Sequence, residues 1–477
     1  MRKMPSVRLV ACALLSGFVI ACSGGTAARA ESRKEVAATD FAPVLAPAPG
    51  QTQVHLPAYR LDARPVTNRQ FLEFVRGRPS WRRDRVASLF ADDGYLSHWA
   101  GPDVLGPDAQ PDQPVTRVSW FAARAYCAAN EARLPSWNEW EWAAAANEQV
   151  ADARANPLWR EQILNWYARP ATDVLQSVGQ GRPNLYGIHD LHGLIWEWVD
   201  DFGSLMVSND SRNQGDPDKL EFCGAGSISA QDRENYPVLM RVAFLSALEG
   251  RSSARRLGFR CADTGPQAAA HTAAAQATAA GPAATPAGQT SVAGSTGVLA
   301  GDSLYQLPID LETDSGAHIA LSSFRGKPLV VTMFYADCNS VCPMLTNQLQ
   351  NLKKRLRPRA RANTHILMVS LDPSHDTPAA LADFGRRHHI GGSTWTLART
   401  DPDTVRVLAA VLGVRYRQLP DQTFNHSTTI TLANPDGVIQ ARTVGVLASD
   451  AELITAADSM FAPTGATRPG GGTQRHR

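Results

Sequence analysis

An uncharged stretch near the middle of the chain constrains its folding more than any other feature of the sequence. Residues 264–301 contain no Asp, Glu, Lys or Arg and consist mostly of Ala, Thr, Gly, Pro, Gln and Ser. Such a stretch offers little large apolar surface to offset the entropy that is lost on ordering. The sequence therefore predicts a flexible linker over residues 263–300, which separates a first unit (51–262) from a second unit (301–462).

Shorter segments of low complexity flank these two units. Residues 31–50, with an Ala- and Pro-rich run, are predicted to be a linker, and residues 463–477, with three consecutive glycines, a disordered tail. The charge is nearly balanced, with 47 Lys and Arg against 45 Asp and Glu. This balance argues against a nucleic-acid partner.

The first 30 residues are typical of an export signal. Basic residues precede an apolar run at residues 9–22, which is shorter than the roughly 20 residues that span a bilayer. The run ends in VIACSGG, which resembles a bacterial lipobox, and this resemblance implies a lipid anchor on Cys22. We therefore expect a periplasmic, membrane-tethered protein. Cleavage after ARA at residues 28–30, which would release a soluble protein, is the alternative.

The second unit alternates strand and helix patterns. Continuous apolar runs at residues 329–334 and 365–371 are typical of buried strands. Residues 428–445 predict an antiparallel hairpin, and Ser449 with Glu452 forms a capping box for a last helix. Strands joined by crossover helices, with a closing hairpin, predict a thioredoxin-like fold.

The sequence CNSVCP places Cys338 and Cys342 between a predicted strand and a predicted helix. A helix N-terminus stabilises negative charge, so we expect lowered thiol pKa values here. Two neighbouring thiolates suit Cu(I) and can also form a disulfide, so metal binding and redox chemistry both remain open. His426 favours copper, because it lies just before the strand that faces the dithiol in thioredoxin-like folds, where dithiol oxidoreductases carry a proline.

Cys338, Cys342 and His426, together with the motif DPSHDTP, resemble the SCO/SenC family over essentially the whole second unit. The resemblance implies that these three residues bind copper in a metallochaperone that assembles a respiratory copper enzyme. Asp372 and Asp376 of the motif are predicted to be structural. A thiol-disulfide oxidoreductase, with Cys338 and Cys342 as its redox pair and as a disulfide when oxidised, is the alternative.

The first unit contains ten of the 11 tryptophans but few clear helix signals; one is the capping-box spacing of Thr67 and Gln70. This composition predicts large rings buried in a core with little regular secondary structure. Its order of motifs resembles the formylglycine-generating-enzyme (sulfatase-modifying factor) family. Three of these blocks are RLPSWNEWEWAA at 133–144, NLYGIHDLHGLIWEWV at 184–199 and LGFRC at 257–261. The resemblance implies a mixed α/β domain, so the chain is predicted to be a multidomain α/β protein.

The resemblance is weaker for activity than for fold. Formylglycine-generating enzymes oxidise a substrate cysteine at copper held by two cysteines, but the chain has no Cys between CGAGSISA at 223–230 and Cys261. Without soft thiolates such a copper site is not expected. The same block resembles accessory proteins of copper nitrite reductases, which implies that enzyme as the client of the chain. Nitrous-oxide reductase and cytochrome oxidase are the alternative clients, and a formylglycine-generating-type oxidase is the second alternative function.

The remaining cysteines of the first unit are given structural roles. Cys223 and Cys261 are predicted to form a disulfide in the oxidising periplasm, with two buried thiols as the alternative. Cys127 lies on the apolar face of a predicted helix and is expected to be a packed core residue.

Two further groups in the first unit contain metal-ligating residue types. The resemblance implies a calcium site with Asp190 and Glu197 as oxygen ligands, and a solvated pair of carboxylates is the alternative. His189 and His192 lie three residues apart on either side of a turn, with no third soft ligand nearby. We therefore predict a structural role for both histidines.

Overall fold

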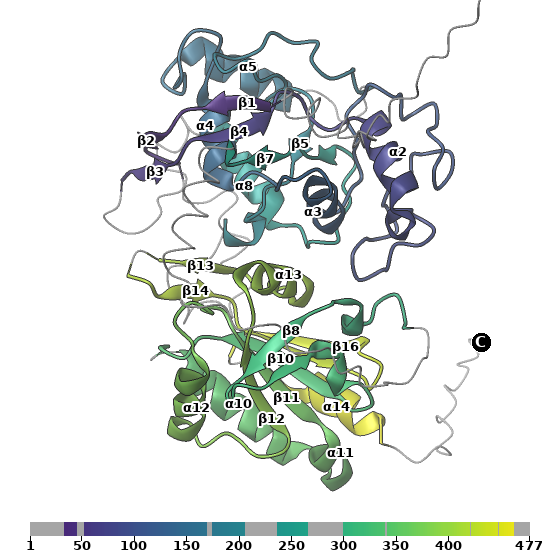
Figure 1. Ribbon diagram of the computed structural model, residues 1–477, viewed down its shortest axis with the longest axis vertical. Helices are drawn as coiled ribbons and strands as arrows, with labels where there is room; N and C mark the ends of the chain where they lie inside the picture. The colour runs from purple at the N-terminus through teal and green to yellow at the C-terminus, as the bar shows by residue number, and fades with distance from the viewer. Residues whose placement is uncertain are drawn as a thin grey trace, which may run out of the picture.

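The computed structural model describes residues 33–44, 52–168, 174–205, 236–265, 299–338, 341–419, 421–446 and 448–461. These residues fold as two units stacked along the long axis of the molecule (Figure 1). Cys22, Cys223 and most of the predicted linker between the units lie outside the described residues. Within the described part of the chain, no helix combines the length and the apolar character needed to cross a bilayer.

The first unit is a mixed α/β domain built from short elements. Its strands are β1 (Arg33–Val36), β2 (Thr39–Phe41), β3 (Val54–Leu56), β4 (Tyr59–Asp62), β5 (Trp196–Glu197), β6 (Leu257–Gly258) and β7 (Ala262–Asp263). Its helices are α2 (Asn68–Gly77), α3 (Trp120–Ala128), α4 (Trp137–Ala145), α5 (Pro157–Tyr167) and α8 (Tyr236–Ser246), with 3-10 turns η1 (Pro79–Trp81) and η2 (Phe202–Ser204). The order β1-β4-β7 forms a three-stranded sheet, and β2 with β3 and β5 with β6 form two-stranded sheets.

The N-terminal strands correct the predicted linker over residues 31–50. β1 pairs antiparallel with β4, and β2 pairs antiparallel with β3. Val36 and Phe41 bury their side chains in the core of the first unit. Because these strands contain so few apolar residues, their hydrophobic pattern alone did not distinguish them from a linker.

The core of the first unit contains fully buried tryptophans, as its composition predicts. The side chains of Trp120, Trp140 and Trp198 are buried, and each indole N–H donates a hydrogen bond to a buried acceptor. Helix α2 begins with the predicted capping box, in which Thr67 and Gln70 bond each other's backbone N–H groups. These hydrogen bonds satisfy the polar groups of the large rings and of the helix end, so that both can be buried in the core.

A disulfide between Cys127 and Cys261 ties α3 to the strand region at the end of the first unit, with a Cα–Cα distance of 5.6 Å. The predicted pairing of Cys223 with Cys261 is therefore wrong, and Cys127 is buried but is not a simple packed thiol. The physical reason is tertiary: packing of α3 against the segment before β7 brings these sulfurs together across a sequence separation of 134 residues.

The second unit has the thioredoxin-like fold that the sequence predicts. Its strands are β8 (Asp310–Thr313), β9 (His318–Ala320), β10 (Leu329–Phe334), β11 (His365–Ser370), β12 (Trp395–Arg399), β13 (Tyr416–Gln418), β14 (Phe424–His426), β15 (Thr429–Ala433) and β16 (Ile439–Val444). Its helices are α10 (Val341–Arg355), α11 (Pro358–Asn363), α12 (Pro378–Arg387), α13 (Pro402–Leu412) and α14 (Ala451–Ser459), with 3-10 turns η5 (Leu304–Gln306) and η6 (Leu321–Phe324).

A seven-stranded sheet of order β16-β15-β10-β11-β12-β8-β9 forms the centre of this unit. β10, β11 and β12 are parallel, and the buried apolar runs of β10 and β11 match the two predicted strands. β15 and β16 form the predicted hairpin. The predicted capping box of the last helix is absent, because α14 begins at Ala451 and Ser449 Oγ accepts from the Ala451 N–H instead of capping with Glu452.

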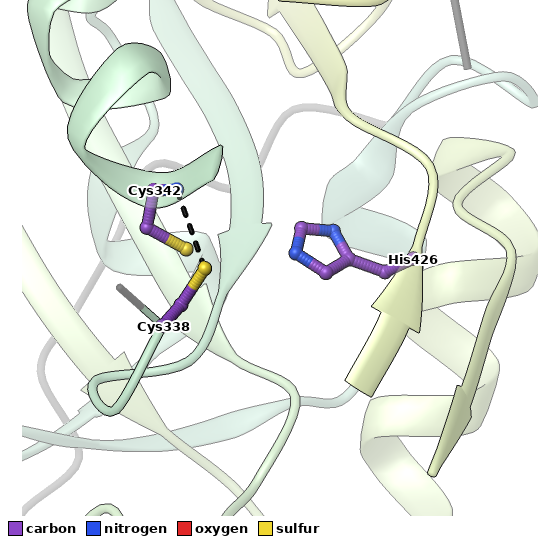
Figure 2. A group of neighbouring side chains, drawn as sticks. All are labelled: Cys338, Cys342 and His426. Carbon is purple, nitrogen blue, oxygen red and sulfur yellow. Dashed lines mark hydrogen bonds between the residues drawn. The ribbon is translucent and has the colours of Figure 1, made fainter. Parts of the chain in front are cut away.

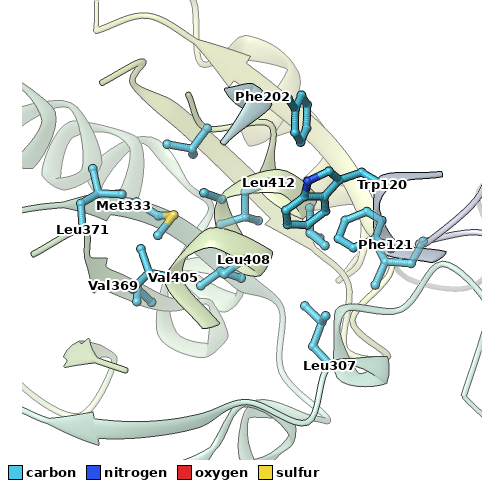
Figure 3. Close-up of a cluster of buried hydrophobic side chains, with 14 of the residues drawn as sticks. Trp120, Phe121, Phe202, Leu307, Met333, Val369, Leu371, Val405, Leu408 and Leu412 are labelled. Carbon is cyan, nitrogen blue, oxygen red and sulfur yellow. The ribbon is translucent and has the colours of Figure 1, made fainter. Parts of the chain in front are cut away.

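A buried apolar cluster joins the two units (Figure 3). Trp120 and Phe121 of α3 and Phe202 of η2 lie beside α13 of the second unit. The buried residues of α13 are Val405, Leu408, Ala409, Val411 and Leu412. A Cβ atom on Gly250 would meet the Phe121 ring at 2.9 Å and the Ala410 Cβ at 3.3 Å, so the units approach closely only because this residue is glycine.

Replacement of both Cys127 and Cys261 by Ala is expected to lower the free energy of unfolding of the first unit by roughly 2–5 kcal/mol, because the unfolded chain gains entropy. Urea unfolding followed by tryptophan fluorescence measures this change. Reductant should shift the wild-type transition and leave that of the double variant in place. Equal midpoints for the oxidised wild type and the double variant would contradict the stabilising role of this disulfide.

Candidate metal centre

Three residues from separate elements of the second unit meet at one end of its central sheet (Figure 2). Cys338 lies in the loop after β10, and Cys342 lies in the first turn of α10. His426 is the last residue of β14, which pairs with β13 as a separate two-stranded ribbon. The structure thus brings together the three residues that the sequence predicts as copper ligands.

The geometry of this group suits one metal ion. One ligand atom from each of Cys338, Cys342 and His426 lies within 4.8 Å of the others, and all three residues are buried. The backbone N–H of Cys342 donates to the Cys338 sulfur at 3.3 Å, which positions that sulfur at the start of α10. It is the one group of three or more metal-ligating side chains within the described residues.

His426 presents a nitrogen that is ready to coordinate. Its Nδ1 lies 3.2 Å from the carbonyl oxygen of Ser427, an arrangement in which the Nδ1–H donates to that oxygen. Its Nε2 is buried and has no hydrogen-bond partner in the described part of the chain. A histidine that donates from one ring nitrogen keeps the lone pair of the other for a metal. A buried imidazole nitrogen beside two sulfurs fits copper, which accepts both thiolate and imidazole ligands.

The electrostatics of the dithiol differ from the prediction. Burial, and then the neighbouring Cys338, raise the pKa of the Cys342 thiol well above its ordinary value. The prediction that the helix N-terminus lowers the thiol pKa is therefore wrong for Cys342, because the loss of hydration outweighs the effect of the helix dipole. Metal binding to this pair must then release protons, because thiolates are the ligands.

Two residues beside the site were not predicted as functional parts of it. The ring of Tyr335 lies edge-to-face to the ring of His426, with the centroids 5.9 Å apart. Burial, and then the nearby Cys338, raise the pKa of Tyr335. Asp376 accepts hydrogen bonds from the Ala336 N–H at 2.9 Å and from Ser370 Oγ at 2.5 Å, and so holds the loop that leads to Cys338. Tyr335 belongs to no recognisable motif, whereas Asp376 lies in the DPSHDTP segment.

The predicted calcium ligands of the first unit have other partners. The carboxylate of Glu197 pairs with Arg260 through two contacts of 2.8 Å and accepts from the Trp140 indole at 2.9 Å, and both charged side chains are fully buried. Asp190 accepts from the Gly179 N–H at 2.5 Å. Glu197 therefore serves in a buried ion pair rather than in the predicted calcium site.

The two histidines of the first unit have the structural contacts that their sequence context predicts. His189 Nδ1 lies 2.8 Å from the Gly181 carbonyl oxygen, and His192 Nε2 lies 2.9 Å from the Ala144 carbonyl oxygen. Burial, followed by the charge of Arg241, lowers the pKa of His192 to about 4. His192 is therefore neutral in the folded protein at neutral pH.

The protein combines two units. One is thioredoxin-like and contains a buried Cys-Cys-His group, and the other is a tryptophan-rich α/β domain. The chain belongs to the family of the sulfatase-modifying factor enzyme 1-like domain, whose model matches residues 15–264. The SCO1/SenC family model matches residues 300–461. Both predicted resemblances are confirmed, one for each unit.

Relatives of the first unit include enzymes and an inactive protein. The formylglycine-generating enzyme of Streptomyces coelicolor is 29% identical over 46% of this chain and 82% of its own length. That of Bos taurus is 27% identical over 44% of this chain and 67% of its own length. The inactive Cα-formylglycine-generating enzyme 2 of Bos taurus is 28% identical over 44% of this chain and 78% of its own length.

Solved structures that resemble the second unit include proteins with copper bound. ScoI of Arabidopsis thaliana with copper is 17% identical, with a TM-score of 0.29, over 32% of this chain and 96% of that chain. Yeast Sco1 with copper is 19% identical, with a TM-score of 0.28, over 34% of this chain and 89% of that chain.

Substitution of Glu197 by Gln is expected to lower the free energy of unfolding by about 3–5 kcal/mol, because it leaves Arg260 buried without its counter-charge. Chemical unfolding of the first unit measures the loss. Glu148→Gln is the matched control: it removes an exposed pair with Arg182, so a loss below about 1 kcal/mol is expected. Stabilisation of the wild type by calcium, absent in Glu197→Gln, would instead restore the calcium assignment.

Acidification is expected to destabilise the fold through His192. The unfolded chain protonates this residue near pH 6.5, whereas the folded protein does so only near its pKa of about 4. Between these values the unfolded state binds more protons, so the stability present above pH 6.5 falls as the pH drops toward 4. His192→Gln should make the pH dependence of the unfolding free energy shallower by about 1 kcal/mol per pH unit. Parallel curves for wild type and variant would contradict this assignment.

Proposed function

We propose that this chain is a copper-binding assembly factor that loads the copper site of a respiratory enzyme. The buried group of Cys338, Cys342 and His426 is the observation that carries this proposal. The match of the second unit to the SCO1/SenC family supports it. Two thiolates and one imidazole hold Cu(I) and still accommodate Cu(II), which suits a site that receives copper and later transfers it.

The residues of the chain perform three tasks in this function. Cys338 and Cys342 supply the sulfur ligands and release their protons when copper binds. The Cys342 N–H steadies the Cys338 sulfur, and the Ser427 carbonyl orients the His426 ring so that Nε2 remains available. The surrounding apolar residues and the ring of Tyr335 exclude water from the ligands.

The location and client of the protein are part of the proposal. Export through the N-terminal signal and acylation of Cys22 would tether the chain to a membrane facing the periplasm. The first unit would recognise the client, and its resemblance to nitrite-reductase accessory proteins favours a copper enzyme of denitrification. A solved relative of the second unit, BsSco, is described as a member of a family of cytochrome c oxidase assembly proteins, which supports a respiratory copper enzyme more generally.

A thiol-disulfide oxidoreductase is the second candidate function. The sulfurs of Cys338 and Cys342 belong to one group within 4.8 Å, so oxidation by a partner disulfide could join them with transfer of two electrons and two protons to that partner. A formylglycine-generating-type oxidase receives less support. Residues 231–260 contain no Cys, and Cys261 is bonded to Cys127.

Copper titration of the reduced full-length chain tests the proposed function. The wild type is expected to retain about one Cu(I) per chain through its dithiol, and the Cys338→Ser and Cys342→Ser variants are expected to lose tight retention because one soft ligand is gone. His426→Ala should weaken Cu(II) binding more than Cu(I) binding. Metal analysis after gel filtration and competition with a chromophoric chelator measure these changes.

The control is His375→Ala, which removes an exposed imidazole that is paired with Asp372 near the site. This variant should bind copper like the wild type. Failure of the reduced wild type to retain copper, or equal retention by Cys338→Ser, would refute the metallochaperone function. Full biological activity of His426→Ala despite lost copper binding would favour the oxidoreductase.

A further inference from the structure

The strand that carries His426 lies outside the main sheet of its own unit, although its side chains are buried and it leads directly into β15. β13 and β14 form a two-stranded ribbon that lies outside the seven-stranded sheet, and Tyr416 is the cross-strand partner of His426. Two hydrogen bonds close this ribbon, from the Ser427 N–H to the Arg415 carbonyl at 2.7 Å and from the Arg415 N–H to Ser427 Oγ at 2.9 Å. The dithiol, in contrast, follows directly from the central strand β10.

The first unit contacts this ribbon and the helix that precedes it. Figure 1 shows α13 and the ribbon β13–β14 on the side of the second unit that faces the first. The turn η2 of the first unit packs against β13. Trp120 and Phe202 of the first unit lie beside α13 in the shared apolar cluster (Figure 3). The imidazole ligand therefore lies on the part of the second unit that the first unit supports.

One carboxylate of the first unit bridges the interface. Asp200 Oδ2 lies 3.0 Å from Arg406 Nε on α13, and Asp200 Oδ1 lies 2.8 Å from Arg124 Nε on α3. The Asp200 side chain is only 13% exposed and that of Arg406 only 32%. Asp200, Arg406 and Tyr416 all line one cleft between the units. The bridge therefore lies beside the cross-strand partner of His426.

A cleft lies beside the bridge. The cleft has a volume of about 520 Å³ and lies between the two units, lined on one side by Asp201 and Ser204 and on the other by Pro373, Tyr416 and Phe424. Asp200 and Arg406 line the same cleft beside the ribbon. The Asp200 bridge, the η2 contact and the shared apolar cluster are the contacts through which the first unit acts on α13 and the ribbon.

We propose that the first unit positions the copper ligand His426, with Asp200 as the positioning residue that acts through Arg406, α13 and the ribbon. This inference rests on the proposed copper function and adds to it that the first unit tunes the metal site of the second. Cu(I) is satisfied by two thiolates, whereas Cu(II) depends more on the harder imidazole nitrogen. Loss of the bridge between Asp200 and Arg406 should therefore weaken the binding of Cu(II) more than the binding of Cu(I).

The test compares full-length variants at the bridge. Asp200→Asn is expected to bind Cu(I) with wild-type stoichiometry but Cu(II) about tenfold more weakly, the scale of effect typical for residues that orient a metal ligand. The nitrogen coupling in the electron paramagnetic resonance spectrum of the Cu(II) form should weaken at the same time. Asp200→Glu, which keeps the carboxylate, should recover much of both properties.

Asp403→Asn is the matched control, because Asp403 pairs with Arg124 at the same interface at 3.4 Å but is 77% exposed. It should leave Cu(II) affinity and spectrum unchanged. Arg406→Gln breaks the bridge from the other side and leaves Asp200 paired with Arg124. It therefore tests the positioning role even if Asp200→Asn does not fold. A purely structural role would lower the unfolding temperature without changing the spectrum.

Two different failures are distinguishable. Wild-type Cu(II) affinity and spectrum in folded Asp200→Asn and Arg406→Gln, with both properties lost in His426→Ala, would overturn the positioning role alone. A wild-type chain that retains no copper would refute the proposed function on which the inference rests.

Discussion

Antiparallel pairing of β15 with β10 is the interaction on which the candidate metal centre depends. The pairing extends to Thr332 opposite Ile430, and Thr332 Oγ1 adds a hydrogen bond to the Thr429 carbonyl at 2.8 Å. In an antiparallel pair the end of one strand meets the start of the other. The loop that follows β10 and the residues that precede β15 therefore meet at one edge, which brings the dithiol to His426.

Burial gives this centre its chemistry. The thiol of Cys342 is desolvated and its pKa is raised, so the protein holds this thiol protonated until a metal or an oxidant arrives. The buried Nε2 of His426 has no hydrogen-bond partner within the described chain, and a bound metal ion would accept its lone pair. A site of this kind suits reversible loading, because ligand binding and proton release are linked.

Much of the fold and of the site could be predicted, and the errors share a cause. Long apolar runs predicted β10 and β11, and cysteine spacing with one histidine predicted the three ligands that the structure brings together. The short strands β1 and β2 were missed, because few of their residues are apolar. The pairing of Cys127 with Cys261 was also missed, because a disulfide depends on distance in space and the sequence offered three cysteines for one bond.

The sequence by itself determined the two units, the family of each and the residue types of the metal centre, because these depend on local patterns and motifs. Only the tertiary structure decided how these residues act. It paired Glu197 with Arg260 in the interior, because a buried charge is stable only beside its counter-charge. It also placed Asp200 against Arg406 of α13, and η2 of the first unit against β13, the partner of the strand that bears His426. No sequence pattern encodes that contact, because it arises from the way two separately patterned units meet.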